Sequence, residues 1–152
     1  MPNKTLALVN TTGRQAASVA RVASALGFDV RAHVFQDSHA VALELSQLPN
    51  VTVIEGSLED RRFVAKLFHG AHRAFINTVT FGDELAIGRL LADAAKKAGI
   101  QHYIYSSMPD HSVYSKGWPA LPMWSVKLTV ENYVRQGRST DYLIDCLLLT
   151  VD

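Results

Sequence analysis

The fold is set by the sequence Thr5-Leu-Ala-Leu-Val-Asn-Thr-Thr-Gly-Arg-Gln-Ala-Ala17, in which an apolar run is followed by a turn and by the start of a helix. Residues 5–10 are a short apolar run that polar residues and Gly13 stop, which indicates a buried strand followed by a tight turn. Small and apolar residues then recur at helical spacing as far as Leu26, and Gly27 stops the helix. The first unit is therefore predicted as strand, turn and helix.

The same alternation continues along the chain. Hydrophobic periodicity and turn residues predict further strands at 29–35, 51–54, 74–77 and 101–105, with a sixth within 142–151. They also predict helices at 38–48, with Ser38 as its N-cap, and at 58–69, 82–98 and 123–136. Strands joined by helices imply right-handed crossovers and a parallel sheet covered on both faces. We expect one α/β domain over residues 1–152, a doubly wound parallel sheet of five to six strands.

Composition excludes several classes of protein. The chain has 152 residues, with 15 Lys+Arg against 14 Asp+Glu, so it lacks the basic character of a protein that binds nucleic acid or a membrane surface directly. Its one cysteine, Cys146, cannot form an internal disulfide, which favours a reduced intracellular compartment. The first apolar run is too short for a signal peptide or a membrane span. The histidines lack metal-ligand spacing, so no metal site is expected.

The turn after the first strand is expected to bind phosphate, because the N-terminus of the first helix in an open α/β sheet attracts anions. Of the three glycines in a dinucleotide-binding fingerprint, only Gly13 is retained, while Asn10 and Ala16 replace the others. Asn tolerates a positive φ, and Ala is small enough for close helix packing. On its own, the turn is also compatible with an ordinary strand-to-helix connection that binds no ligand.

Selection between NAD and NADP is normally made at the end of the second strand, where an acid holds the adenosine ribose and an Arg admits a 2′-phosphate. That end carries Phe35, which can do neither. Arg14 and His33 are candidates for a 2′-phosphate contact, and the alternatives are an exposed helix-start role and a mid-strand role, respectively. The residues themselves therefore leave NAD and NADP open.

Five segments of the chain form a distinctive set: 9–18, 74–78, 82–88, 101–111 and 130–136. Together they resemble the NmrA-like family, fungal regulators of nitrogen metabolite repression within the atypical short-chain dehydrogenase/reductases. The resemblance extends over roughly residues 4 to 136, and the stretches 106–111 and 118–127 are its most specific parts.

The resemblance implies a Rossmann domain that binds NAD or NADP, with the oxidised forms favoured, and does not turn them over. It implies a redox-sensing corepressor of nitrogen metabolite repression, located in the cytoplasm and nucleus, that acts through a GATA-type zinc-finger activator. Members of the family continue into a smaller C-terminal lobe, so we expect this lobe to be missing from a chain truncated after its sixth strand. Its absence would leave apolar surface bare and favour self-association.

The resemblance also implies the cofactor contacts. The pyrophosphate would be held by Asn10, Thr11, Thr12, Gly13, Arg14 and Gln15. The adenosine would be bordered by Phe35, Gln36, Ser57 and Leu58, and the nicotinamide half by Thr78, Ser106 and Lys127. Asn77, next to Thr78, is also expected to contact the cofactor, and His33 is expected to do so as the 2′-phosphate candidate. Relatives that prefer NADP carry Arg where this chain has Phe35, which argues against a strong NADP preference.

Catalysis is not expected. Short-chain reductases need a Tyr hydroxyl that passes a proton to the substrate, a Lys four residues later and a Ser that orients the carbonyl. Lys127 is present, and Ser106 or Ser107 is the retained Ser, but Met123 occupies the position of the Tyr. Methionine has no proton to transfer, so the pattern favours a sensor.

The alternative function is an NAD(P)H-dependent reductase of the isoflavone-reductase-like type. Tyr105 or Tyr114 would then supply the proton, although neither has the required spacing from Lys127. The structural alternatives are a surface role for Lys127 and a gap-filling core role for Met123. Trp118, Trp124 and Tyr114 lie in or beside a Pro-rich loop over the expected cleft, where a partner-binding or lid role and simple packing are equally compatible with the sequence.

Overall fold

The computed structural model describes the backbone of residues 5–137 and 143–148. The strands are β1 (Thr5–Leu8), β2 (Asp29–Val34), β3 (Val51–Glu55), β4 (Arg73–Ile76), β5 (His102–Ser107) and β6 (Leu143–Leu148). The helices are α1 (Arg14–Ala25), α2 (Ala40–Ser46), α3 (Arg61–Phe68), α4 (Glu84–Ala98), α5 (His111–Tyr114) and α6 (Pro122–Gln136). The predicted alternation of strands and helices is confirmed.

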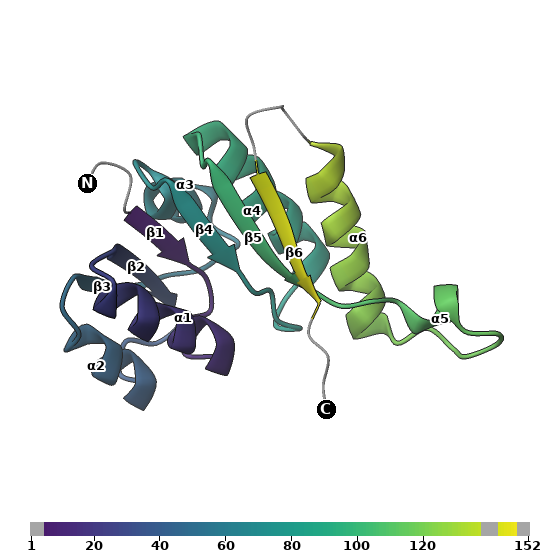
Figure 1. Ribbon diagram of the computed structural model, residues 1–152, viewed down its shortest axis with the longest axis horizontal. Coiled ribbons are helices and arrows are strands. Elements are labelled where there is room, and N and C mark those ends of the chain that lie inside the picture. The colour runs from purple at the N-terminus through teal and green to yellow at the C-terminus, as the bar shows by residue number, and fades with distance from the viewer. Residues whose placement is uncertain (1–4, 138–142, 149–152) are drawn as a thin grey trace.

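The six strands form one sheet in the order β3-β2-β1-β4-β5-β6, and every neighbouring pair is parallel (Figure 1). The chain runs outward from β1 to β3 and then crosses back to β4 on the other side of β1. The strand order therefore reverses between β1 and β4. In open α/β sheets this reversal opens a crevice at the carboxyl ends of the strands, where ligands bind.

Helices cover both faces of the sheet. This arrangement explains why the sequence of β1 is continuously apolar. Leu6 and Leu8 pack with α1 and α2 on one face. Ala7, with Val9 just after the strand, packs with α3, α4 and α6 on the other. Because alternate side chains enter separate cores, a central strand of this kind needs no polar face.

Some helices begin and end where the sequence predicted, and others do not. The helix predicted over 82–98 ends at Ala98 as expected, because Gly99 adopts a left-handed conformation and caps α4. Ser38 was predicted to cap α2, and that prediction is wrong. The cap is His39, whose Nδ1 accepts the Val41 N–H at 3.2 Å. The next helix in the chain, α3, starts at Arg61, later than predicted, because the Asp60 carboxylate caps it.

The predicted Pro-rich loop contains the short helix α5, which Figure 1 shows projecting away from the sheet. Trp124 packs in this segment, with its ring 4.6 Å from that of His111, whereas the side chain of Trp118 is 66% exposed. The side chain of Tyr114 lies outside the described residues. Within the described ranges, no helix combines the length and the apolar character needed to cross a membrane.

Candidate functional site

The turn after β1 has the conformation that its sequence predicts. Asn10 is left-handed, with φ at 57°, and its carbonyl accepts the Gly13 N–H at 3.1 Å. Gly13 itself has an ordinary φ of −74°, but a Cβ there would lie 3.3 Å from the Asn10 carbonyl oxygen. A side chain at Gly13 would therefore be tight against the turn, whereas the positive φ of the turn is supplied by Asn10.

The helix α1 begins at this turn with Gly13 as its N-cap and without a side-chain cap. Its first residue, Arg14, is exposed, and Thr12 is half-buried. The amides of its first turn thus carry the partial positive charge that attracts anions. Thr11 is buried and its hydroxyl points back to the Leu8 carbonyl, so a ligand can meet only its backbone.

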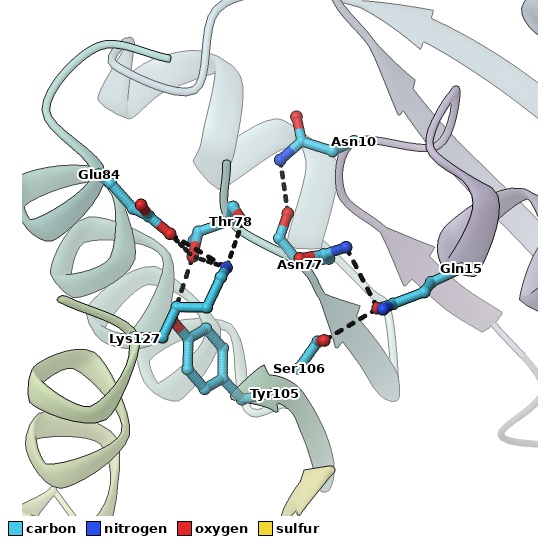
Figure 2. Close-up of polar contacts among 8 residues, drawn as sticks. All are labelled: Asn10, Gln15, Asn77, Thr78, Glu84, Tyr105, Ser106 and Lys127. Carbon is cyan, nitrogen blue, oxygen red and sulfur yellow. Dashed lines mark hydrogen bonds and ion pairs between the residues drawn. The ribbon is translucent and has the colours of Figure 1, made fainter. Parts of the chain in front are cut away.

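Hydrogen bonds connect the turn to the ends of β4 and β5 (Figure 2). The amide of Asn10 donates through Nδ2 to the Asn77 carbonyl at 2.5 Å. The Gln15 Oε1 accepts twice, from Asn77 Nδ2 at 3.2 Å and from the Ser106 hydroxyl at 2.8 Å. Four predicted cofactor contacts are therefore brought together at the carboxyl edge of the sheet.

A second polar network surrounds Lys127. Its ammonium donates to the Thr78 carbonyl at 2.5 Å and to Glu84 Oε1 at 3.1 Å, as Figure 2 shows. The side chains of this ion pair are only 15% and 6% exposed, respectively. The alternative of a surface lysine is therefore wrong.

The Thr78 hydroxyl joins the same network. It donates to Glu84 Oε1 at 2.8 Å and lies 3.0 Å from the Tyr105 hydroxyl, which is fully buried. Because the one hydroxyl hydrogen of Thr78 is directed to Glu84, Tyr105 donates to Thr78. A Tyr hydroxyl and Lys127 thus meet on the same threonine oxygen.

Met123 lies one helical turn before Lys127 and is 51% exposed. With Leu121, Val126 and Leu85 it lines an apolar pocket of about 590 Å³ that Glu84 also borders. The alternative of a gap-filling core residue is therefore wrong. Met123 thus presents a thioether, which has no proton to transfer, at the edge of this pocket.

The two serines at the end of β5 point to different partners. Ser106 faces the phosphate turn through Gln15. Ser107 is buried and donates to Glu131 Oε2 at 2.6 Å, on α6. Successive residues of a strand face opposite sides, so only Ser106 reaches the crevice.

His33 does not make the 2′-phosphate contact that we considered. Its ring is fully buried, Nδ1 accepts the Asn10 N–H at 3.1 Å, and Nε2 lies 3.0 Å from the Gly56 carbonyl. Burial lowers the pKa of His33 to about 4, and the hydrogen bond to the Gly56 carbonyl only partly opposes this. An uncharged imidazole with both nitrogens in use cannot bind phosphate, so the mid-strand alternative holds and Arg14 remains the candidate.

Some of the residues at the part of the site expected to hold the adenosine are aromatic. Phe35 lies at the surface, 6.0 Å from the exposed ring of Phe81, and Gln36 is exposed beside it. Ser57 is exposed, whereas the Leu58 side chain is buried in the core. The prediction for Leu58 therefore fails for its side chain, because only its backbone remains to border a ligand.

Glu84 is a residue of the candidate site that sequence reasoning missed. An acidic residue in the first turn of a helix is ordinarily explained by the helix dipole. Its partner Lys127 is 43 residues away, and no spacing rule connects them. The described residues contain no group of three or more His, Cys, Asp or Glu side chains that could hold a metal ion.

Comparison with known proteins places these features in a family. The model of the NmrA-like family matches residues 2–150. The nitrogen metabolite repression protein nmrA of Emericella nidulans is 61% identical over 136 residues, which is 88% of this chain and 38% of that protein. An NmrA-like family domain-containing oxidoreductase, FrzB of Cladobotryum, is 30% identical over 91% of this chain and 44% of its own length. The chain thus spans less than half the length of these curated relatives.

Solved structures agree. NmrA, a negative transcriptional regulator, in complex with NAD is 54% identical, with a TM-score of 0.90 over 97% of this chain and 45% of that one. The complex of NmrA with NADP gives a TM-score of 0.88 at the same identity and coverage. NmrA therefore binds both dinucleotides on the fold described above.

Proposed function

The chain belongs to the NmrA-like family, and from this membership we propose that it is a dinucleotide-binding regulator and not an enzyme. In this role it is a negative regulator of transcription in nitrogen metabolite repression. This role is supported by the names of its relatives, a nitrogen metabolite repression protein and a negative transcriptional regulator.

The proposed cofactor is NAD or NADP, and the residues at the crevice fit it. Asn10 Oδ1 is a buried acceptor that no described residue satisfies, so a hydroxyl donor at the turn would complete it. Gly13 leaves room for close approach, and the uncapped first turn of α1 favours an anion. Arg14, exposed at the same turn, would reach the phosphates.

The proposed absence of catalysis rests on one observation: Met123 lies one helical turn before Lys127, and the Lys127 ammonium is already bonded within the protein. A bound dinucleotide supplies a site for hydride transfer, but reduction of a carbonyl also requires a proton. Met123 has no proton to give. Lys127 is neutralised by Glu84 and directed to Thr78, so its charge is already committed within the protein. Cofactor binding is thereby retained while proton transfer is lost.

We propose that the bound dinucleotide reports the redox state of the cell, with the oxidised forms bound more tightly. The proposed partner is a GATA-type zinc-finger activator, held inactive by this protein in the cytoplasm and nucleus. An immobilised zinc-finger domain, incubated with the chain with and without NAD, tests this partner. Specific retention supports it, and retention no better than on an unrelated zinc finger contradicts it.

The second candidate is a reductase, which the oxidoreductase name of a 30% identical relative favours. Tyr105, which shares the Thr78 hydroxyl with Lys127, would be its proton donor. An assay of NADH and NADPH oxidation with quinone and enone acceptors separates the two functions. We expect no turnover. Turnover that is lost in Tyr105→Phe would establish the reductase and overturn the regulator.

A further inference from the structure

The imidazole of His33 connects two loops that leave neighbouring strands. Nδ1 accepts the backbone N–H of Asn10, in the turn after β1. Nε2 bonds the carbonyl of Gly56, in the loop after β3. The backbone carbonyl of His33 also accepts the Thr11 N–H at 2.9 Å. One residue of β2 therefore holds the phosphate turn at two consecutive amides.

The surroundings of the ring fix it in place. The ring of Phe35 lies 4.9 Å away and that of Phe63 lies 5.6 Å away, both edge-on. Gly56 has no side chain, and a Cβ there would overlap the Phe63 ring. Because Gly56 has no side chain, the Phe63 ring fits beside it and the loop after β3 can approach His33 closely.

The contacts allow only one protonation state. A backbone N–H can only donate, so Nδ1 must be the unprotonated nitrogen, and the proton lies on Nε2, where the Gly56 carbonyl accepts it. In an imidazolium the Nδ1 proton would face the Asn10 N–H. The bridge therefore exists only in the uncharged Nε2–H tautomer.

The bridge acts on the one strained residue of the turn. Asn10 is left-handed, with φ at 57°, a conformation that Asn tolerates better than most residues but less readily than glycine. Its N–H would be buried without a partner if Nδ1 were removed, because Asn10 is 6% exposed. His33 thus stabilises a conformation that glycine would adopt without help.

We propose that His33 is a positioning residue for dinucleotide binding, which holds Asn10 in the conformation that shapes the phosphate turn and couples this turn to the loop after β3. Its effect on affinity rests on the proposed function, whereas the bridge itself does not. Asn10 and His33 together replace the first glycine of the fingerprint.

Five variants test this role by calorimetric titration with NAD. His33→Leu replaces the imidazole with an apolar side chain and removes the bridge, so the dissociation constant should rise about tenfold or more. His33→Gln offers an amide oxygen to Asn10 and an amide N–H to Gly56, so affinity should remain within about threefold of wild type. In an Asn10→Gly background, His33→Leu should weaken binding less, since glycine needs no support. His72→Leu, before β4 at the opposite edge of the sheet, is the control and should bind normally.

Nitrogen NMR of the imidazole and hydrogen exchange of the Asn10 amide test the bridge without a ligand. We expect the Nε2–H tautomer and a protected Asn10 amide in wild type, loss of this protection in His33→Leu and recovery in His33→Gln. A wild-type protein that binds no dinucleotide but shows this NMR pattern contradicts the proposed function and retains the bridge. An Nδ1–H tautomer, or unchanged affinity and protection in His33→Leu, overturns the inference.

Discussion

Glu84 and Lys127 form an ion pair that is largely shielded from solvent. Glu84 also accepts the Thr78 hydroxyl, so three elements, the end of β4, α4 and α6, meet at one carboxylate oxygen. A buried charge is costly when its partner is lost, although the net value of the intact pair is modest. The pair is therefore a sensitive point of the fold as well as of the site.

Glu84→Ala should lower the free energy of unfolding by about 2 to 4 kcal/mol, because it leaves the Lys127 ammonium without its counter-charge. Urea unfolding followed by circular dichroism measures this change. The matched control is Glu44→Ala, which breaks an ion pair with Arg21 whose side chains are 44% and 50% exposed. That variant should cost at most about 1 kcal/mol. Equal losses in both variants would contradict the assignment of Lys127 to a buried pair.

His33 gives the stability of the protein a pH dependence. Its pKa falls from 6.5 to about 4 on folding, so below pH 6.5 the unfolded chain binds a proton that the folded chain does not. Stability should therefore fall as the pH is lowered from 6.5 towards 4, and this residue should contribute a loss of about 2 kcal/mol by pH 5.

Urea unfolding at about pH 7.5 and pH 5, for wild type and His33→Gln, isolates this contribution, because glutamine does not titrate. The difference in stability between the two pH values should be smaller in the variant by that amount. An equal pH dependence in both proteins would show that His33 is not held uncharged in the fold.

Among the elements, the contact between α4 and α6 places Glu84 next to Lys127. Gly88 of α4 makes it possible, because a Cβ there would lie 2.6 Å from a methyl group of Val130 on α6. The two helices therefore approach each other at a position where one side chain is absent. Since α4 carries Glu84 and α6 carries Lys127, this packing also sets the geometry of the ion pair.

Gly88→Ala should destabilise the protein by about 1 to 3 kcal/mol through overpacking, although alanine is the better helix former. Adding Val130→Ala should relieve the overlap, so the double variant should lose less than the sum of the two single changes. Thermal or urea unfolding of the three variants completes this cycle. A stabilising Gly88→Ala would mean that helix propensity outweighs contact at this position.

Local signals in the sequence were sufficient for most of the fold. The apolar run of β1 and the left-handed glycine after α4 each report on a conformation that nearby residues determine. The left-handed Asn10 was predictable for the same reason. The N-cap of α2 was not, because Ser38 and His39 both offer an acceptor and only the path of the chain selects between them.

The parts of the site that could not be predicted depend on contacts between distant segments. His33 is 23 residues from both of its partners, and Glu84 is 43 residues from Lys127. A histidine at the end of a strand has the same appearance whether it binds phosphate or supports a turn. Burial and the positions of its two nitrogens distinguish these roles, and both arise only when the strands assemble.

For the molecule as a whole, the candidate dinucleotide edge is assembled from residues between Asn10 and Lys127. All of the sheet neighbours that shape this edge, from β3 to β5, are present. The chain spans 38% of the length of its Emericella relative. Dinucleotide binding at the crevice can therefore be tested on this chain alone.

Calorimetric titration of the purified chain with NAD, beside a Gly13→Val variant, is the decisive measurement. We expect saturable binding at one site per chain, and loss of binding in Gly13→Val, because a side chain at this position is forced against the Asn10 carbonyl and towards the phosphates. Circular dichroism must show that both proteins are folded. A folded wild-type chain that binds no NAD, or equal binding by the variant, would contradict a dinucleotide site at this turn.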